Sequence, residues 1–316
     1  MSDADAPSSR ATAGQAPLAT ERFLCRGRSR EMDVVRGLLA ALGASVSADR
    51  TSGDSVPEVC YLDSASPPAA SPSGSGTATV RVQPHSFPDG SRRPVSSVIT
   101  AAATGLLDVT GEAGGPPSVP GVDLPAAVSG AFATIGALAA RYAALQGRPV
   151  PTVEVPVYDA SVAMLSYMAV SYFASGLVPA RLGTSHPTIY PYNAFRALDG
   201  DFVIAPFTQR FWRNYCYAIG RPDLIDDERF VNFAARLKNK SVLDGILRPV
   251  MLTRTVAEWL DAMKEADVPS GPVLSVPDAL SHPQTVHRRH LMSVAVAGGS
   301  AYPFRWARLE DAGEDS

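Results

Sequence analysis

Hydrophobic residues recur at helical spacing in three stretches of the chain. Within residues 28–46 they lie at helical spacing until Gly43 ends the pattern and a short β-like run follows: Met32, Val35, Leu38, Leu39 and Leu42. Residues 125–146 are mostly Ala, Gly, Leu and Ile, and predict a long buried helix. Residues 159–175 predict a second apolar helix that ends at Gly176.

Other stretches alternate in the manner of strands. Residues 78–82, with the sequence ATVRV, predict one strand, and residues 152–160 predict another that runs into the following helix. Residues 193–206 form two short apolar runs around Asp199–Gly200, a pair of residues typical of a β-hairpin turn. By contrast, residues 51–76 are rich in Pro, Ser and Gly, and we expect a loop or linker there.

The order of these elements predicts an α/β fold, because strands and helices alternate along the chain. The texture changes near residues 180–195, where a proline-rich loop precedes the hairpin, so we expect a domain boundary there. Farther on, Thr255 followed by Glu258 forms a capping-box pattern at the start of a helix. Residues 1–22 predict a flexible leader without the features of a signal peptide.

The amino-acid composition and net charge limit the classes of function that are open to the chain. The 316 residues are 46% hydrophobic and 19% charged, as in globular proteins, and the net charge of −3 gives no reason to expect a nucleic-acid partner. We expect no membrane span, since polar residues interrupt every apolar run. The three scattered cysteines indicate a reducing, cytoplasmic environment, and the histidines lack metal-binding spacing, so no metal is expected.

The junction between residues 119 and 130 attracts attention as a possible reactive site, because free N–H groups meet the positive end of the long helix there. The ionisable side chain at this junction is Asp123, and Pro125, Ala126 and Ala127 follow it. Asp123 followed by Leu-Pro also fits an N-cap residue. The sequence therefore leaves two interpretations of Asp123 open, a reactive carboxylate and a helix cap.

From about residue 95 to 304 the chain resembles the family III CoA-transferases, a group that includes formyl-CoA and carnitine CoA-transferases and 2-methylacyl-CoA racemases. The resemblance is carried by residues in a fixed order: His186-Pro187, Pro191-Tyr192, Phe195, Asp199-Gly200, Trp212, GRPDL (220–224), DERF (227–230), Asn232, Ala235-Arg236, Glu258-Trp259, VPSGPV (268–273) and HPQ (282–284). Two upstream segments, TGEAGGPPSVPGV (110–122) and VEVPVYDA (153–160), also resemble the family.

The resemblance implies an interlocked homodimer. Each subunit would have a Rossmann-like large domain, here residues 23–190 and 276–316, and a small α/β domain at 195–275. In the family, an aspartate at the start of the helix after the TGE loop attacks the acyl thioester. That position falls on Ala126 here, and a methyl group can neither attack a thioester nor carry a proton.

The resemblance also implies which residues would line the cavity between the domains. Asp123 is a possible replacement carboxylate, and His186, Tyr190 and Tyr192 could supply acid, base or oxyanion contacts from a loop over the active site. Ala126 and Pro191 would contact the substrate. The alternative is that the prolines stiffen a linker and that His186 makes a structural hydrogen bond.

The N-terminal half is short for this family and contains no glycine-rich phosphate motif, so we expect no bound cofactor and an incomplete CoA pocket. Three hypotheses follow. The chain is a diverged enzyme that no longer transfers CoA and acts as a lyase, isomerase or cyclase on a small acyl-type or specialised metabolite. Alternatively, it is an active CoA-transferase or racemase that uses Asp123, or a non-catalytic subunit that pairs with an intact relative.

Overall fold

The structure is a computed structural model that describes residues 22–25, 30–41, 45–47, 59–63, 78–83, 96–149 and 152–288. The chain divides into two compact units, each described separately below. Unit 1 contains the described parts of Met1–Leu107, Pro120–Val178 and Leu280–Ser316, and unit 2 contains Asp108–Val119 and Pro179–Ala279. Except for Arg22, which begins the first strand, the predicted leader lies outside the described residues.

A five-stranded parallel sheet forms the centre of unit 1, in the order β2-β1-β3-β4-β5. Its strands are β1 (Arg22–Cys25), β2 (Ser45–Ser47), β3 (Val59–Asp63), β4 (Ala78–Gln83) and β5 (Val153–Pro156). A parallel sheet that packs against α1 (Arg30–Ala41) and α3 (Leu124–Leu145) confirms the predicted α/β class.

Strand β3 overturns the prediction that residues 51–76 are a loop or linker. Val59–Asp63 pairs with β1 on one side and with β4 on the other, so it occupies the middle of the sheet. Its five residues are flanked by Pro-, Ser- and Gly-rich sequence, so the local pattern did not predict a strand. The strands that stabilise it lie far away in the chain.

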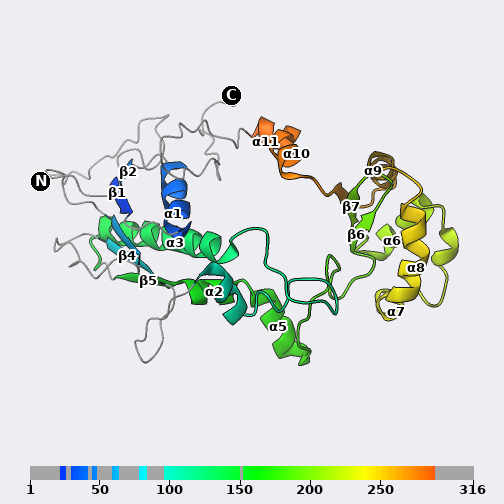
Figure 1. Cartoon of the computed structure of the whole chain (residues 1–316), viewed down its shortest axis with the longest axis horizontal. Coiled ribbons are helices and arrows are strands. Elements are labelled where there is room, and N and C mark those ends of the chain that lie inside the picture. The colour runs from blue at the N-terminus through cyan, green and yellow to red at the C-terminus, as the bar shows by residue number, and fades with distance from the viewer. Residues whose placement is uncertain are drawn as a thin grey trace, which may run out of the picture. The chain divides into compact units, whose positions relative to one another are not determined.

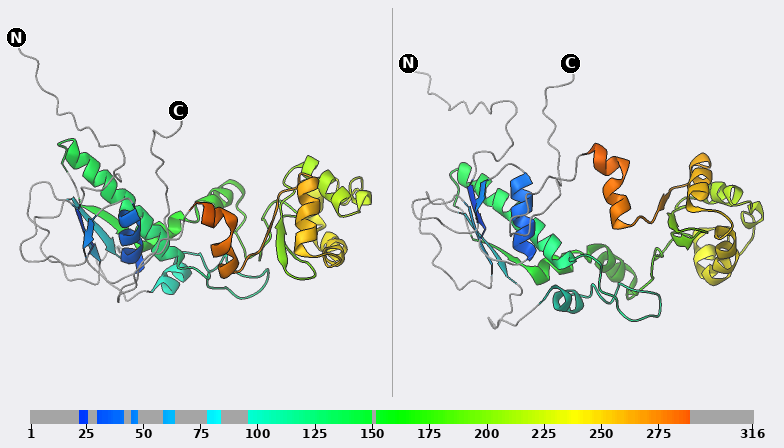
Figure 2. Two further views of the ribbon diagram at one scale, coloured as in Figure 1. Left: turned by 90° about the horizontal axis from the view of Figure 1, so that it is seen from above. Right: turned by 45° about the horizontal axis from the view of Figure 1, so that its top comes forward.

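The helices of unit 1 are α1 (Arg30–Ala41), α2 (Ser97–Ala103), α3 (Leu124–Leu145), α4 (Val157–Ala163), α5 (Ser166–Ser175) and α11 (Pro283–His287). Three of them, α1, α2 and α4, pack against the long helix α3 that the sequence predicted. The predicted helix at 159–175 is divided into α4 and α5, and Gly176 ends it in the left-handed conformation as expected. Helix α3 lies along the sheet and beside α1 (Figures 1 and 2).

Small residues explain how closely α3 approaches the sheet. Ala133, Ala137 and Ala140 are buried against Val80 of β4 and Val155 of β5. A Cβ atom added at Gly136 would lie 2.8 Å from Val153 Cγ1, so a larger residue would push the helix away. Among the described helices, α3 alone is long and apolar enough to cross a membrane, judged by length and composition. The core helix of a soluble domain meets the same criterion.

Unit 2 is built on a three-stranded antiparallel sheet in the order β6-β7-β8, with strands β6 (Asn193–Arg196), β7 (Asp201–Ile204) and β8 (Ser270–Pro272). The hairpin predicted around Asp199–Gly200 is confirmed, since Arg196 pairs with Asp201 across the turn. Its helices are α6 (Gln209–Ala218), α7 (Phe233–Lys238), α8 (Lys240–Met251) and α9 (Val256–Glu265). Helix α10 (Val276–Ser281) follows β8.

Aromatic residues fill the core of unit 2. Trp212 of α6, Trp259 of α9 and Phe202 of β7 are fully buried, and the rings of Phe202 and Trp259 stack. The predicted capping box is present: the Thr255 hydroxyl accepts a hydrogen bond from the Glu258 N–H, and the Glu258 carboxylate accepts one from the Thr255 N–H. Local sequence and tertiary packing therefore agree at the start of α9.

Candidate functional site

Asp123 forms the N-cap of α3. Its Oδ1 accepts a hydrogen bond from the Ala126 N–H at 3.1 Å, and its Oδ2 pairs with Arg30 Nη1 of α1 at 2.8 Å. Pro125 is the second helical residue, where its missing N–H costs no helical hydrogen bond. The N-cap interpretation of Asp123 is therefore confirmed, and both of its carboxylate oxygens have partners.

Ala126 is the third residue of α3 and only 2% exposed. The first turn of this helix contains no acidic side chain. One turn later, the Ser129 hydroxyl donates a hydrogen bond to the carbonyl of Pro125, so this hydroxyl is also occupied within the helix. The start of α3 therefore offers a buried methyl group where a thioester-attacking carboxylate was expected.

His186 and Tyr192 form a stacked pair in unit 2. Their ring centroids are 5.1 Å apart at an interplanar angle of 12°, and the His186 N–H donates to the Tyr192 carbonyl at 2.9 Å. The Thr188 N–H donates to His186 Nδ1 at 3.2 Å. Because Nδ1 accepts this bond, the neutral imidazole carries its proton on Nε2. His186 is thus arranged to donate a hydrogen bond through Nε2.

In the sequence, Tyr190 and Pro191 lie between His186 and Tyr192. Both are buried, and the peptide bond that joins them is cis. Tyr190 belongs to the core of unit 2, where its hydroxyl donates a hydrogen bond to Asp244 of α8. Asp244 also pairs with Arg248 at 3.2 Å. Burial, and secondarily the bond to Asp244, raise the pKa of Tyr190 above its ordinary value. Tyr190 therefore holds its proton and packs in the core.

A short loop is fastened to the segment that leads to His186. Arg181 Nε donates to the Gly115 carbonyl at 2.9 Å, and its Nη1 pairs with Asp108 at 2.9 Å. The Gly183 N–H donates to the Gly111 carbonyl at 2.9 Å. These bonds explain why residues 108–119, which the sequence prediction assigned to the large domain, cluster with unit 2.

This loop presents Glu112, a carboxylate that the sequence reasoning did not single out. Glu112 is exposed, and its carboxylate has no hydrogen-bond or ion-pair partner among the described residues. A Cβ atom added at Gly183 would lie 2.8 Å from Glu112 Oε2, so the carboxylate lies against the backbone three residues before His186. The signal available in the sequence was the TGE segment within residues 110–122.

Arg236 holds the same segment from inside unit 2. Its guanidinium is fully buried and lies over the rings of Trp212 and Phe233, each 4.7 Å from the ring centroid. Nε donates to the Tyr190 carbonyl at 3.0 Å and Nη1 to the Phe230 carbonyl at 2.8 Å. Burial lowers the pKa of Arg236 to about 10. Arg236 thus fixes the backbone between His186 and Tyr192.

The sequence-predicted site residues fall into two groups. Asp123 and Ala126 belong to unit 1, whereas a contiguous group belongs to unit 2: His186, Tyr190, Pro191 and Tyr192. Within unit 2 the structure pairs His186 with Tyr192 and directs Tyr190 into the core. Across the parts of the chain that the structure describes, no group of three or more His, Cys, Asp or Glu residues could hold a metal ion.

Comparison with known protein families shows to which family the chain belongs. The model of CoA-transferase family III matches residues 81–312, which is well over half of the chain. The chain belongs to CoA-transferase family III. The resemblance inferred from residues 95–304 is therefore confirmed, and the match extends in both directions beyond it.

Several curated CoA-transferases are similar to this chain. An acetyl-CoA:oxalate CoA-transferase from Acetobacter aceti is 33% identical over 211 residues, which cover 66% of this chain and 54% of that enzyme. A succinyl-CoA:mesaconate CoA-transferase from Haloarcula hispanica is 32% identical, covering 64% and 50%. A succinyl-CoA:glutarate CoA-transferase from Mus musculus is 30% identical, covering 65% and 47%. The chain spans about half the length of these relatives.

Solved structures share the fold. The crystal structure of Rv3272 from M. tuberculosis has a TM-score of 0.72 to this chain at 19% identity, covering 92% of this chain and 94% of the other. A CAIB/BAIF family protein from Brucella suis has a TM-score of 0.69 at 20% identity, covering 87% and 88%. At these identities the similarity concerns the fold alone.

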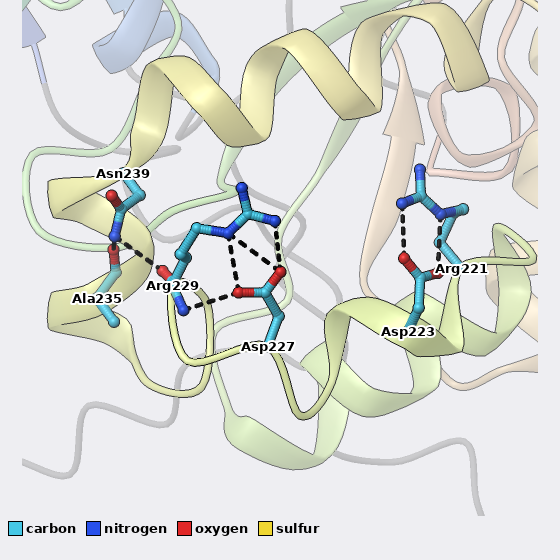
Figure 3. A network of polar contacts seen from close by, with 6 residues as sticks. All are labelled: Arg221, Asp223, Asp227, Arg229, Ala235 and Asn239. Atoms are coloured by element: carbon cyan, nitrogen blue, oxygen red, sulfur yellow. Dashed lines mark hydrogen bonds and ion pairs between the residues drawn. The ribbon is translucent and has the colours of Figure 1, made fainter.

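Several of the residues that carry the family resemblance have structural partners in unit 2 (Figure 3). In GRPDL, Arg221 and Asp223 are joined by two hydrogen bonds of 2.8 and 2.6 Å. In DERF, Asp227 and Arg229 form a similar pair, with Nη2 to Oδ2 at 2.6 Å. Asn239 then joins this turn to α7, because its side chain donates to the carbonyl of Arg229. These motif pairs lie in the segment that leads to α7.

Proposed function

We propose that this member of CoA-transferase family III acts on a small acyl-type molecule without transferring CoA through an acyl-aspartate. The observation that carries the proposal is the first turn of α3, where Ala126 is buried and Asp123 is occupied by the helix cap and by Arg30. A carboxylate held in this way is a poor nucleophile, since attack on a thioester would require it to give up the hydrogen bond from the Ala126 N–H and the ion pair with Arg30. We therefore propose lyase, isomerase or cyclase chemistry, which needs no acyl-aspartate.

The geometry of unit 2 supports proton transfer as the chemical step. Reactions of this kind on an acyl thioester can begin with removal of a proton from the carbon next to the carbonyl. In our proposal the Glu112 carboxylate accepts that proton, and the electron pair of the broken C–H bond moves onto the carbonyl oxygen. His186 Nε2–H then donates a hydrogen bond to this oxygen, while Tyr192 supports the imidazole by stacking.

The substrate class that we propose is an acyl group with a second, free carboxylate. The names of the relatives support it, because oxalate, mesaconate and glutarate are all dicarboxylic acids. We further propose a cytoplasmic location, supported by the three scattered cysteines, and a Rossmann-like large domain formed by unit 1, supported by its parallel sheet.

A homodimer, or pairing with an intact relative as a non-catalytic subunit, is supported by the surface of α5. None of the ten residues of this helix is buried in the chain, and Tyr167, Val170 and Phe173 are all exposed, Phe173 to 82%. Apolar surfaces of this kind mark protein contacts. Sedimentation of the purified chain tests the dimer, with Phe173→Ser as the variant that should weaken it.

The chemical proposal is tested by two measurements on the purified chain with succinyl-CoA. In D₂O, mass spectrometry should show deuterium entering the succinyl group, and His186→Gln should abolish this exchange whereas His282→Gln should leave it unchanged. His282 is a suitable control because it caps the short helix α11 instead. Absence of exchange with every dicarboxylic thioester offered, from a chain that binds them, would support the non-catalytic subunit.

The second measurement addresses the transferase alternative. Intact-mass analysis after succinyl-CoA treatment should show no hydroxylamine-sensitive adduct on the wild-type chain, and Asp123→Asn should retain the deuterium exchange. An adduct that forms on the wild type and disappears in Asp123→Asn would show that Asp123 is the nucleophile, and would refute the proposal.

A further inference from the structure

Lys240, the first residue of α8, has an ammonium group that no carboxylate neutralises. Its Nζ donates to the Ser185 hydroxyl at 2.9 Å and lies 5.3 Å from the centre of the Tyr190 ring. Among the described residues no Asp or Glu lies within ion-pair distance of it. The carboxylate one helical turn later, Asp244, is occupied by Arg248 and by the Tyr190 hydroxyl.

The position of Lys240 connects this charge to the proposed site. Ser185 directly precedes His186, and Tyr190 lies between His186 and its stacking partner. The same segment is held from the core by Arg236, so its backbone is fixed beside the lysine. An unneutralised cation bonded to a hydroxyl next to His186 is suited to bind an anionic oxygen, since a hydroxyl gives up such a bond at little cost.

We propose that Lys240 binds the free carboxylate of a dicarboxylic acyl group and selects such substrates over monocarboxylic ones. This inference rests on the proposed function, which supplies the substrate class. In the bound state the ammonium exchanges the Ser185 hydroxyl for a carboxylate oxygen and keeps its contact with the Tyr190 ring. The residue is a specificity determinant and takes no part in proton transfer.

The test compares two CoA thioesters whose acyl groups have the same five-carbon chain, glutaryl with one free carboxylate and valeryl with none. Their affinities are measured by calorimetry on the full chain and on four variants. Lys240→Met retains the length of the side chain but removes its charge, and should weaken binding of the glutaryl thioester about 10- to 100-fold while leaving binding of the valeryl thioester unchanged. Lys240→Arg should retain the preference. Lys238→Met, on the exposed end of α7, should bind as the wild type does.

Ser185→Ala separates anion binding from a merely structural tether. If the bond between Lys240 and Ser185 only fastens the segment, this variant should lose as much affinity as Lys240→Met. Under our proposal it retains the preference for the glutaryl thioester, because the ammonium remains. A wild-type preference for the glutaryl thioester that persists in Lys240→Met would overturn the role of Lys240 alone. Equal wild-type affinity for both thioesters would overturn the role of Lys240 together with the proposed substrate class.

Discussion

Tyr190→Phe separates a structural role of Tyr190 from the catalytic role that the sequence allowed. The substitution removes the hydroxyl, and with it the hydrogen bond to Asp244, but keeps the aromatic ring in the core of unit 2. The substitution creates no cavity larger than the lost oxygen. The loss of folding stability therefore comes almost entirely from the missing hydrogen bond to Asp244. The chemistry proposed for His186 and Glu112 does not use the hydroxyl, so deuterium exchange should continue.

The magnitude follows from the partners of Asp244. A hydrogen bond to a charged group contributes about 1.5–3 kcal/mol to stability. Asp244 keeps its ion pair with Arg248, and its side chain is 21% exposed, so water can replace part of the loss. We therefore expect a destabilisation of about 1.5 kcal/mol. For a unit of this size that corresponds to a fall in Tm of about 6 °C.

The assay is tryptophan fluorescence during thermal unfolding. Trp212 and Trp259, two of the three tryptophans, are both buried in this core, so the signal reports on unit 2. Tyr217→Phe is the matched control, because its ring is 67% exposed on α6 and should leave Tm unchanged. An unchanged Tm in Tyr190→Phe combined with lost exchange would refute the structural role and restore the catalytic one.

The pH dependence gives a second check. Burial raises the pKa of Tyr190 in the folded chain, while in the unfolded chain it titrates near 10. Above about pH 10 the unfolded state therefore binds fewer protons than the folded state, and stability falls as pH rises. Tyr190→Phe lacks this titration. The stability difference between the two chains should be constant from pH 6 to 9 and should narrow above pH 10.

Three further predictions test other parts of the structure. Asp123→Ala removes the cap of α3 and should lower stability by about 1 kcal/mol, whereas Asp123→Asn, which can still cap, should lower it less; urea unfolding of the two variants checks this order. Gly183→Ala should cost about 1–2 kcal/mol in the same assay, because Gly183 has φ +60° and the Glu112 carboxylate that its new Cβ would meet is the end of an exposed side chain that can move away; Gly114→Ala, at φ +73° with open space, should therefore cost about as much. Burial raises the pKa of the Cys216 thiol to about 12, so peptide mapping should find it unalkylated by iodoacetamide at both pH 7 and pH 9 until urea unfolds the chain; rapid native labelling would contradict its burial.

Local patterns predicted those elements whose stabilising contacts lie nearby in the sequence. The hairpin at Asp199–Gly200, the capping box at Thr255 and the cap at Asp123 each depend on residues within a few positions of one another. Strand β3 depends instead on β1 and β4, so its five residues gave no adequate local signal. Neighbouring sequence can specify a turn or a cap, but it cannot specify which strands a short segment will join.

The candidate site shows the same limit. Tyr190 and Tyr192 are two positions apart, and only tertiary packing decides that the first enters the core while the second stacks on His186. The contacts that hold or extend the site cross long stretches of chain: Arg236 reaches Tyr190 over 46 residues, and Lys240 reaches Ser185 over 55. No periodicity within one element contains such information.

The motif residues in unit 2 and the residues at the start of α3 make separate sets of contacts, which is consistent with our proposal that the family fold is kept without an acyl-aspartate. The motif pairs Arg221–Asp223 and Asp227–Arg229 shape turns in unit 2, and none of these bonds involves the start of α3. At the start of α3 the helix needs a cap, which Asp123 supplies, and a small buried side chain, which Ala126 supplies. A carboxylate at Ala126 would satisfy neither need. Under our proposal, Ala126 therefore stands where the resemblance implies a nucleophile and meets the needs of the helix start.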